Sequence, residues 1–210
     1  DYFCRAFVGL TRSSKSIYGK ADSFSRNAKH LGFRSRSSLK LLEIQNKDRF
    51  IKTSSKVLDL GSSPGGWSQV AAEILNKDGL ILSVDKKSMK PIRGVYFLKK
   101  DIKNLEKNDF LINKKNINNF DIVLSDIAPN ISGIPEVDAA NMVRLLDTIK
   151  IIIKSYLIVK GSALIKVFHG ESFDNMIIFM KSEFQKVKIR KPKSSRPNSS
   201  ETYILGLGKK

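Results

Sequence analysis

Hydrophobic positions from about residue 37 onward follow two alternating patterns. Short apolar runs that end in glycine or an acidic residue predict buried β-strands, and apolar residues spaced three or four positions apart predict helices. The predicted strands are 56–60, 80–84, 95–98, 121–124, 162–168, 186–189 and 203–206, and the predicted helices are about 37–44, 67–75, 137–157 and 173–184. Gly161 is expected to end the long helix, and the polar run 113–119 is expected to form a loop. This alternation predicts an α/β fold, with a mostly parallel seven-stranded sheet and helices on both faces.

The carboxyl ends of the predicted strands carry glycine and charged residues. These residues are Gly61, Asp85, Asp101, Asp126 and Lys166. In parallel α/β sheets, ligands bind at this edge, near the point where the strand order reverses. We therefore interpret these residues as candidates for a functional site.

The segment 59–67, with the sequence DLGSSPGGW, follows a predicted strand and opens a predicted helix. Glycines let the backbone approach a ligand closely, and a helix N-terminus offers free N–H groups to an anion. The spacing matches neither a P-loop, which needs Gly-Lys-Ser/Thr, nor the dinucleotide pattern G-x-G-x-x-G. A tight strand–helix turn is the alternative, and Trp67 suits a ligand site or the core equally well.

The acid that ends the second strand strengthens the cofactor hypothesis. Asp85 lies 24 positions after Gly61, close to the spacing of about 20 for a carboxylate that binds ribose hydroxyls. Asp101, after the third strand, is placed to contact the base. Together they predict an adenosine-bearing cofactor without a pyrophosphate. S-adenosylmethionine fits, with its amino-acid end near the turn 65–67, whereas a nicotinamide cofactor or no cofactor is the alternative.

Four charged residues stand where such a fold would bring them together: Lys40, Asp126, Lys166 and Glu201. Lys166 is the most informative, because it lies inside the apolar run 163–168. A buried lysine costs free energy unless it is paired or neutral. A neutral Lys166 would be a general base. The alternative is a structural pair with Asp126.

Composition narrows the possible functions. A length of 210 residues favours one domain. One cysteine and two histidines argue against a disulfide framework, a cysteine-based zinc cluster and a histidine-rich metal site, so no metal is expected. No apolar run reaches the roughly 18 residues that would span a membrane. We expect an intracellular monomer without a membrane partner.

The net charge of +18 is concentrated at the two ends of the chain. Residues 1–56 hold 13 basic and 4 acidic residues, and residues 181–210 hold 9 and 2, whereas residues 57–180 hold 16 and 14. Segregated lysine and arginine favour a nucleic-acid partner over a merely soluble surface. The predicted phosphate contacts are Arg34, Arg36, Lys191, Lys193 and Arg196. For each of them, a solvated surface charge is the alternative.

The N-terminal segment differs in composition from the rest. The sequence begins with Asp1, and residues 2–21 contain basic residues and serines but no acid. We expect residues 1–23 to be a basic arm or a processed targeting remnant, and residues 24–210 to form a single domain. A mitochondrion or another organelle is slightly favoured over the cytoplasm or nucleus.

Several sequence blocks resemble one family in combination and in order. From about residue 24 to the C-terminus, the chain is similar to the FtsJ-type, heat-shock-related ribosomal RNA 2′-O-ribose methyltransferases. The blocks are LGFRSRSSLKLLEI (31–44), VLDLGSSPGGWSQVA (57–71), SDIAPNISG (125–133), VDAANMV (137–143), LIKVFHGESFD (164–174) and KPKSSRPNSSETYI (191–204). One mild departure is Ser62-Ser63, where bacterial members more often have two alanines.

The resemblance implies a Rossmann-like S-adenosylmethionine-dependent methyltransferase fold, with S-adenosylhomocysteine as product. It implies a catalytic tetrad of Lys40, Asp126, Lys166 and Glu201. The expected cofactor contacts are Gly61, Ser63, Pro64, Gly65, Gly66, Trp67, Asp85, Asp101, Ile102 and Asp126. The implied partner is large-subunit ribosomal RNA, free or within the ribosomal subunit, and the implied target is a uridine ribose in the peptidyl-transferase region.

In this hypothesis the ribose 2′-oxygen attacks the sulfonium methyl in line. Lys166 either takes the hydroxyl proton or stabilises the developing alkoxide, and the sequence leaves both roles open. The alternatives are a 2′-O-methyltransferase acting on an mRNA cap or a transfer RNA, a base N-methyltransferase, a nicotinamide-dependent dehydrogenase, and a catalytically silent RNA-binding assembly factor.

Overall fold

The computed structural model describes residues 17–112, 115–117, 119–129, 132–196 and 199–210, and for residues 17–22, 115 and 116 it describes the backbone alone. Most of the predicted arm 1–23, with Cys4, lies outside the described residues. Within them, no helix is both long enough and apolar enough to cross a membrane.

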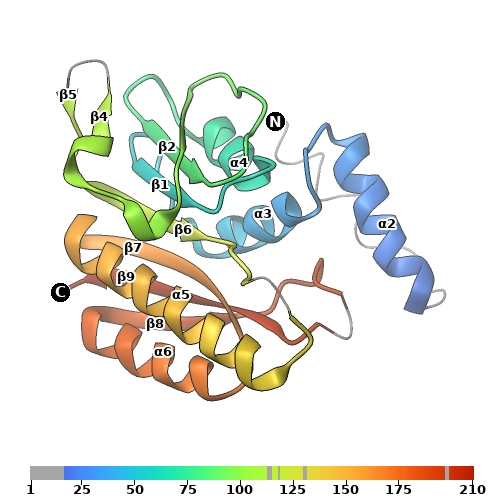
Figure 1. Ribbon diagram of the computed structural model, residues 1–210. Helices are drawn as coiled ribbons and strands as arrows, with labels where there is room; N and C mark the ends of the chain where they lie inside the picture. Colours follow the sequence, from blue (N-terminus) through green and yellow to red (C-terminus); the bar gives the residue numbers. More distant parts are fainter. Residues whose placement is uncertain (1–16, 113–114, 118, 130–131, 197–198) are drawn as a thin grey trace.

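Seven strands form the central sheet, which confirms the predicted fold class (Figure 1). They are β1 (Lys56–Leu60), β2 (Leu80–Asp85), β3 (Val95–Lys99), β6 (Phe120–Ser125), β7 (Leu157–Phe168), β8 (Phe184–Arg190) and β9 (Glu201–Lys209). Their order is β3-β2-β1-β6-β7-β9-β8. All pairs from β3 to β7 are parallel, whereas β9 runs antiparallel to both β7 and β8. The carboxyl ends of β1, β2, β3 and β6 therefore meet at one edge.

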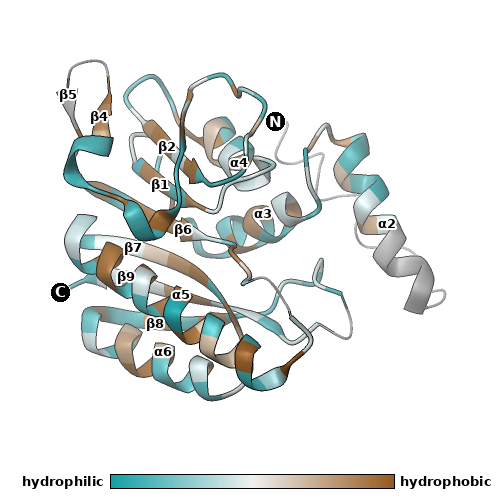
Figure 2. Ribbon diagram, in the orientation of Figure 1, coloured by the Kyte–Doolittle hydropathy of each residue, from teal (hydrophilic) through white to brown (hydrophobic). Residues whose placement is uncertain are grey.

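Helices cover both faces of this sheet. They are α2 (Ile17–His30), α3 (Ser37–Asp48), α4 (Gly66–Ile74), α5 (Pro135–Tyr156) and α6 (Glu171–Glu183). Alternate strand residues point to opposite faces, so Val57 packs in the same cluster as the α3 and α4 residues, and Leu58 packs with those of α5 and α6. Figure 2 shows the hydrophobic residues concentrated in the inner strands. These two hydrophobic clusters pack against opposite faces of the sheet and so fix the position of its carboxyl edge.

The structure differs from the sequence prediction at three elements. Helix α2 was not predicted, because few of its residues are apolar; Ala28 is one of them, and it is buried. The long helix ends at Tyr156, one residue before its predicted end, but β7 begins directly at Leu157 rather than after Gly161, because Leu157 already pairs with Phe120 of β6. The polar run 113–119 contains β5 (Lys115–Asn116), which pairs with β4 (Leu111–Ile112). Short 3₁₀ turns at Ile102–Asn104 and Lys107–Phe110 precede this pair.

Candidate active site

Four charged side chains from four elements meet beyond the carboxyl end of β6. Lys40 of α3 forms an ion pair with Glu201, the first residue of β9. Lys166 of β7 lies with its Nζ 3.2 Å from Oδ1 of Asp126, which directly follows β6. The two lysines and two carboxylates predicted from the sequence are therefore close together in the fold, and their charges balance.

Lys166 is buried as predicted, with 9% of its side chain exposed. Its Nζ also donates a hydrogen bond of 2.5 Å to the main-chain carbonyl of Asp126. A buried ammonium needs such partners to offset the loss of hydration. Because both partners accept hydrogen bonds, the arrangement stabilises positive charge at Nζ and aims it at the end of β6.

Glu201 is held in its ionised form. Burial alone raises the pKa of this carboxyl, but the hydrogen bond and charge of Lys40, the Ser195 hydroxyl and the charge of Lys166 outweigh burial and leave the pKa below its usual value. Because the charge of Lys166 acts on Glu201 together with that of Lys40, the two ion pairs lie within electrostatic reach of each other.

Tyr203 contacts members of both ion pairs, Asp126 and Lys40. Sequence reasoning did not identify it. It pairs directly with Lys166 across β7 and β9, and its hydroxyl donates a 2.9 Å hydrogen bond to Oδ1 of Asp126. Its ring packs against Trp67, and the Lys40 ammonium lies 5.8 Å from the ring centroid. Burial, followed by the charges of Asp126 and Glu201, raises the pKa of Tyr203 well above its usual value. An apolar strand with one tyrosine gave no signal of this role.

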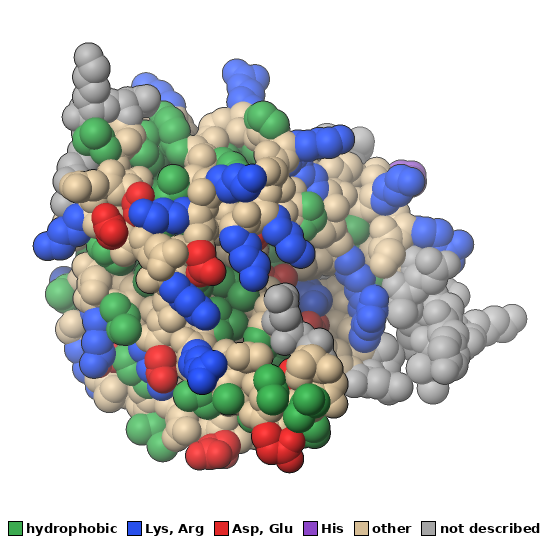
Figure 3. Space-filling view, in the orientation of Figure 1, with side chains coloured by type: hydrophobic (Ala, Val, Ile, Leu, Met, Phe, Trp, Pro, Cys, Tyr) green, Lys and Arg blue, Asp and Glu red, His purple; other side chains and the backbone are tan. Residues whose placement is uncertain are grey.

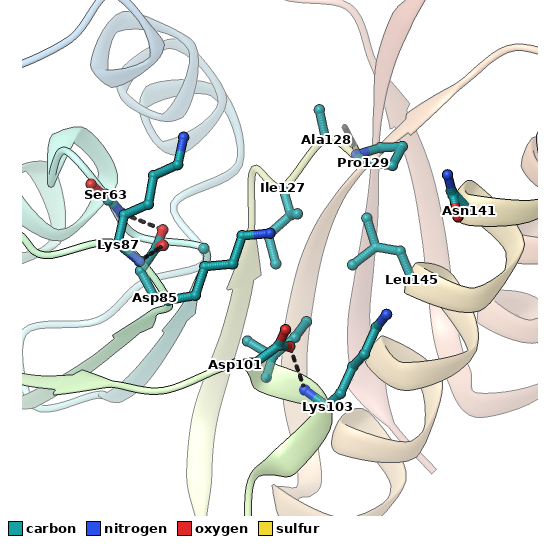
Figure 4. Close-up of a pocket in the computed structure, with 13 residues that line it drawn as sticks. Ser63, Asp85, Lys87, Asp101, Lys103, Ile127, Ala128, Pro129, Asn141 and Leu145 are labelled. Carbon is teal, nitrogen blue, oxygen red and sulfur yellow. Dashed lines mark hydrogen bonds between the residues drawn. The ribbon is translucent and has the colours of Figure 1, made fainter. Parts of the chain in front are cut away.

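A cavity of about 360 Å³ opens beside this cluster, at the ends of β1, β2, β3 and β6. Figure 4 shows its walls: Asp85 and Asp101 on the strand side, Ile127, Ala128 and Pro129 above, and Asn141 and Leu145 of α5 opposite. The predicted cofactor residues that line it are Gly61, Ser63, Asp85, Asp101 and Ile102. Asp126 immediately precedes the Ile127 wall, so the cavity and the ion-pair cluster adjoin.

The two carboxylates in the cavity are oriented by main-chain N–H groups. Asp85 accepts hydrogen bonds from Ser63 N at 2.9 Å and from Lys87 N at 2.7 Å. Asp101 accepts one of 3.0 Å from Lys103 N. A carboxylate has about four acceptor positions, so both acids keep free lone pairs for ligand hydroxyl or amino groups.

Asp59 of β1 lies buried behind the cavity. Burial raises the pKa of Asp59 to about 7; the charges of Asp126 and Asp85 also raise it, and the Ser68 hydroxyl opposes the rise. Ser68 donates to Asp59 at 2.6 Å and contacts the Ser83 hydroxyl at 2.8 Å. Asp85 and Asp126 therefore add negative charge to the strand-end region, which suits a cationic ligand, whereas a pKa of about 7 leaves Asp59 only partly ionised at neutral pH.

The turn at residues 64–67 lies outside the cavity lining, although the sequence predicted cofactor contacts there. A Cβ at Gly66 would collide with the Ser35 and Ser38 hydroxyls. The glycine therefore allows close packing of α4 against the start of α3, and the predicted cofactor contact at this turn stays a prediction. Trp67 is 2% exposed, and its Nε1 donates to the Ser37 carbonyl at 2.9 Å. Its side chain is a core residue, the alternative that the sequence left open, and Pro64 and Gly65 belong to the same turn.

Three of the five predicted RNA contacts have internal partners. The Arg34 guanidinium donates to the carbonyls of residues 90 and 91 at 2.5 and 2.6 Å, Arg36 donates to the Ser194 carbonyl, and Lys191 Nζ donates to the Ser199 carbonyl at 2.6 Å. These bonds fasten loops around the site and occupy N–H groups that would otherwise be free to bind phosphates. Lys193 donates its main-chain N–H to the Glu43 carboxylate at 2.7 Å, but no hydrogen bond of its ammonium group or of the Arg196 guanidinium is found in the described part of the chain, so among these five they are the better candidates for RNA contact.

Sequence reasoning also missed several cavity residues. They are Lys86, Lys87, Lys103, Ile127, Ala128, Pro129, Asn141 and Leu145. The lysines directly follow the predicted cofactor acids, which was a signal available in the sequence. Asn141 and Leu145 are brought in by α5, whose position over the strand ends is a tertiary feature. Among the described residues, no group of histidine, cysteine and acidic side chains could hold a metal ion.

Known proteins resemble this chain over most of its length. The family model described as "FtsJ-like methyltransferase" matches residues 33–209. The protein named "Ribosomal RNA large subunit methyltransferase E" from Methylobacillus flagellatus is 43% identical over 188 residues, which cover 89% of this chain and 90% of that protein. The protein of the same name from Marinobacter nauticus is 44% identical over 187 residues, with 89% and 90% coverage.

Solved structures agree with this similarity. A crystal structure described as a ribosomal RNA methyltransferase from Plasmodium falciparum has a TM-score of 0.72 and 31% sequence identity, and it covers 84% of this chain and 98% of that one. The fibrillarin pre-rRNA processing protein from Methanococcus jannaschii has a TM-score of 0.52 at 14% identity, with 76% of this chain and 69% of that chain covered. The latter likeness concerns the fold alone.

Proposed function

The chain belongs to the FtsJ-like methyltransferase family, and we propose that it transfers the methyl group of S-adenosylmethionine to a ribose 2′-hydroxyl of large-subunit ribosomal RNA. The observation that carries this proposal is the pair of ion pairs, Lys40–Glu201 and Lys166–Asp126, beside a cavity with oriented carboxylates. The relatives' printed names supply the substrate class.

The cavity residues fit S-adenosylmethionine. The oriented carboxylates of Asp85 and Asp101 suit ribose hydroxyl and adenine amino groups. The apolar side chains of Ile102, Ile127 and Leu145 offer flat contact area for an adenine ring. When bound, the cofactor supplies a methyl group on a positively charged sulfur, which is an activated donor. The acids around Asp59 favour that positive charge over the neutral product.

Lys166 is placed to stabilise negative charge on the attacking 2′-oxygen. Its two acceptor contacts favour the ammonium form, which supports a role as a cationic stabiliser over a role as a resting base. Asp126 orients Lys166 through the 3.2 Å contact, and Tyr203 in turn orients Asp126. Lys40, held by Glu201, adds a second positive charge to the site. The chain's own residues thus position the hydroxyl and lower the energy of its developing alkoxide, and in this role of Lys166 the hydroxyl proton passes to solvent water as the oxygen–methyl bond forms and the methyl–sulfur bond breaks.

The deciding experiment measures methyl incorporation from labelled S-adenosylmethionine into large ribosomal subunits purified from cells that lack this protein. Capped mRNA and transfer RNA serve as competing substrates, and mapping of ribose methylation identifies the nucleotide. We expect incorporation into the large subunit alone; incorporation only into cap or transfer RNA would refute the substrate assignment.

Lys166→Ala tests the assigned chemistry. We expect a loss of 10²-fold or more in kcat, on the order of one electrostatic or proton-transfer contribution, with S-adenosylhomocysteine affinity within about twofold of wild type. Lys166→Arg separates the two roles, because a guanidinium remains charged and does not act as a base. Activity of the arginine variant well above that of the alanine variant supports the stabiliser. Near-normal turnover of Lys166→Ala would contradict both roles.

Assembly and location are further parts of the proposal. We propose that the protein acts as a monomer, which light scattering of the purified protein tests. We also propose an organellar location. The segment 2–21 supports it, because it contains basic residues and serines but no acid, which is typical of organellar targeting sequences. Imaging the full chain with a C-terminal fluorescent tag tests the location, and a purely cytoplasmic signal would overturn it.

A further inference from the structure

Three exposed lysines line the cofactor cavity in addition to its acids. They are Lys86, Lys87 and Lys103. Within the described part of the chain, no hydrogen bond or ion pair engages their ammonium groups, although the main-chain N–H groups of Lys87 and Lys103 bind Asp85 and Asp101. The nearby Lys100, by contrast, is paired with Asp109 at 2.7 Å. The mouth of the cavity therefore carries three ammonium groups that have no hydrogen-bond or ion-pair partner of their own in the described residues, while the acids beside them remain open to the cofactor.

The cofactor cannot account for this charge. S-adenosylmethionine carries a sulfonium and an ammonium, which are cations, and a single carboxylate. Three ammonium groups around a net cationic ligand are unfavourable unless an anion neutralises them. Figure 4 shows Lys87 and Lys103 extending from two different strand ends, each next to the aspartate that its own N–H group holds. The acids suit the cofactor, and the lysines suit a second, anionic ligand.

We propose that the RNA backbone crosses the mouth of the cofactor cavity and contacts Lys86, Lys87 and Lys103 with its phosphates. This inference rests on the proposed RNA substrate and adds to it a contact surface on the opposite side of the site from the predicted loop 191–196. Bound RNA then covers the cofactor. The binding of each is therefore expected to raise the affinity of the protein for the other.

Sheet topology supports this path. The lysines follow β2 and β3, at one end of the strand order, whereas Lys193 and Arg196 lie in the connection between β8 and β9, at the other end. The ion-pair cluster lies at β6, β7 and β9, between the two basic regions. An RNA strand that touches both regions therefore crosses the carboxyl edge of the sheet, where the ion-pair cluster lies. Figure 3 shows lysine and arginine side chains gathered around the hollow of this face.

The test compares two triple variants of the full-length protein. The first carries Lys86→Gln, Lys87→Gln and Lys103→Gln. The matched control carries Lys47→Gln, Lys56→Gln and Lys77→Gln, which removes three exposed lysines near the amino edge of the sheet. Both variants lose the same net charge, so a difference between them reports position rather than total charge.

Binding of an unmodified large-subunit ribosomal RNA transcript is measured against potassium chloride concentration. Three lost phosphate contacts should lower the slope of log affinity against log salt by about 2, since each contact contributes about 0.7 on single strands. We expect RNA affinity to fall at least tenfold and calorimetric S-adenosylhomocysteine affinity in the absence of RNA to stay within twofold. In wild type, the transcript should tighten S-adenosylhomocysteine binding by the same factor as S-adenosylhomocysteine tightens RNA binding, and the first variant should lose this effect.

Two results would overturn the inference. One is a salt slope in the first variant equal to that of the control. The other is weaker S-adenosylhomocysteine binding with an unchanged RNA slope, which would assign the lysines to the cofactor carboxylate. Both results leave the proposed function standing if wild type still methylates large subunits. Failure of wild type to bind or methylate ribosomal RNA would instead refute the proposed function itself.

Discussion

Replacing Tyr203 with phenylalanine removes one hydroxyl group from beneath the ion-pair cluster. The 2.9 Å hydrogen bond to Asp126 is lost, while the ring contacts with Trp67 and Lys40 remain. Asp126 keeps its contact with Lys166, but Oδ1 loses one of its two side-chain partners. The carboxylate can then rotate, and Lys166 loses its alignment.

The size of the effect follows from the burial of this bond. Hydrogen bonds to charged groups contribute about 1.5–3 kcal/mol, and Tyr203 is fully buried. If the bond supports folding, the variant should lose about 2 kcal/mol of unfolding free energy, which corresponds to roughly 4–8 °C in Tm for a chain of this size. If it mainly positions Lys166, kcat should fall about tenfold or more while KM for the cofactor stays unchanged.

Differential scanning calorimetry measures the change in Tm, and steady-state methyl-transfer assays measure the change in kcat. Tyr156→Phe is the matched control, because Tyr156 is also buried and packs edge-on against Phe110, and its hydroxyl has no hydrogen-bond partner in the described residues. We expect the control to change Tm and kcat little. A Tyr203→Phe variant with wild-type Tm and wild-type kcat would show that the hydroxyl does not support Asp126.

Two further predictions concern pH. The pKa of Glu201 is lowered in the fold. Its stabilising contribution is therefore present above the usual pKa near 4.5 and is lost as pH falls through the lowered value. The difference in unfolding free energy between wild type and Glu201→Gln, measured by urea titration, should become smaller from pH 6 to pH 3. The pKa of Asp59 is raised from 3.8 to about 7, so wild type should lose stability relative to Asp59→Asn as pH rises from 3.8 to about 7. An Asp59→Asn variant whose stability follows the wild-type pH profile would refute the second.

Sequence patterns predicted the seven strands and the residues at their carboxyl ends. This worked because buried strands are short apolar runs, and because parallel strands end at a common edge. Lys166 was recognisable for the same reason, since a charge inside an apolar strand has a desolvation cost. The four members of the ion-pair cluster were identified through their family resemblance as well as through these positions.

Side-chain partners were beyond sequence reasoning. Arg34 and Arg36 looked like phosphate contacts, but main-chain carbonyls from distant loops accept their hydrogen bonds. Trp67 suited a ligand site and the core equally well in the sequence, and only its contacts with Ser37 and Tyr203 showed that its indole ring lies in the core. Helix α2 has too few apolar residues to predict, because its place depends on what it packs against.

The amino-acid sequence by itself determined the α/β architecture, the cofactor-side acids and the identity of the four charged residues, since each depends on local pattern and order along the chain. Only the tertiary structure decided which charges remain available. It gave Arg34 internal acceptors and placed Tyr203 under Asp126, and it left Lys86 and Lys87 exposed at the cavity. The physical reason is that hydrogen bonds and ion pairs form between residues far apart in sequence, and their geometry is set by packing rather than by residue type.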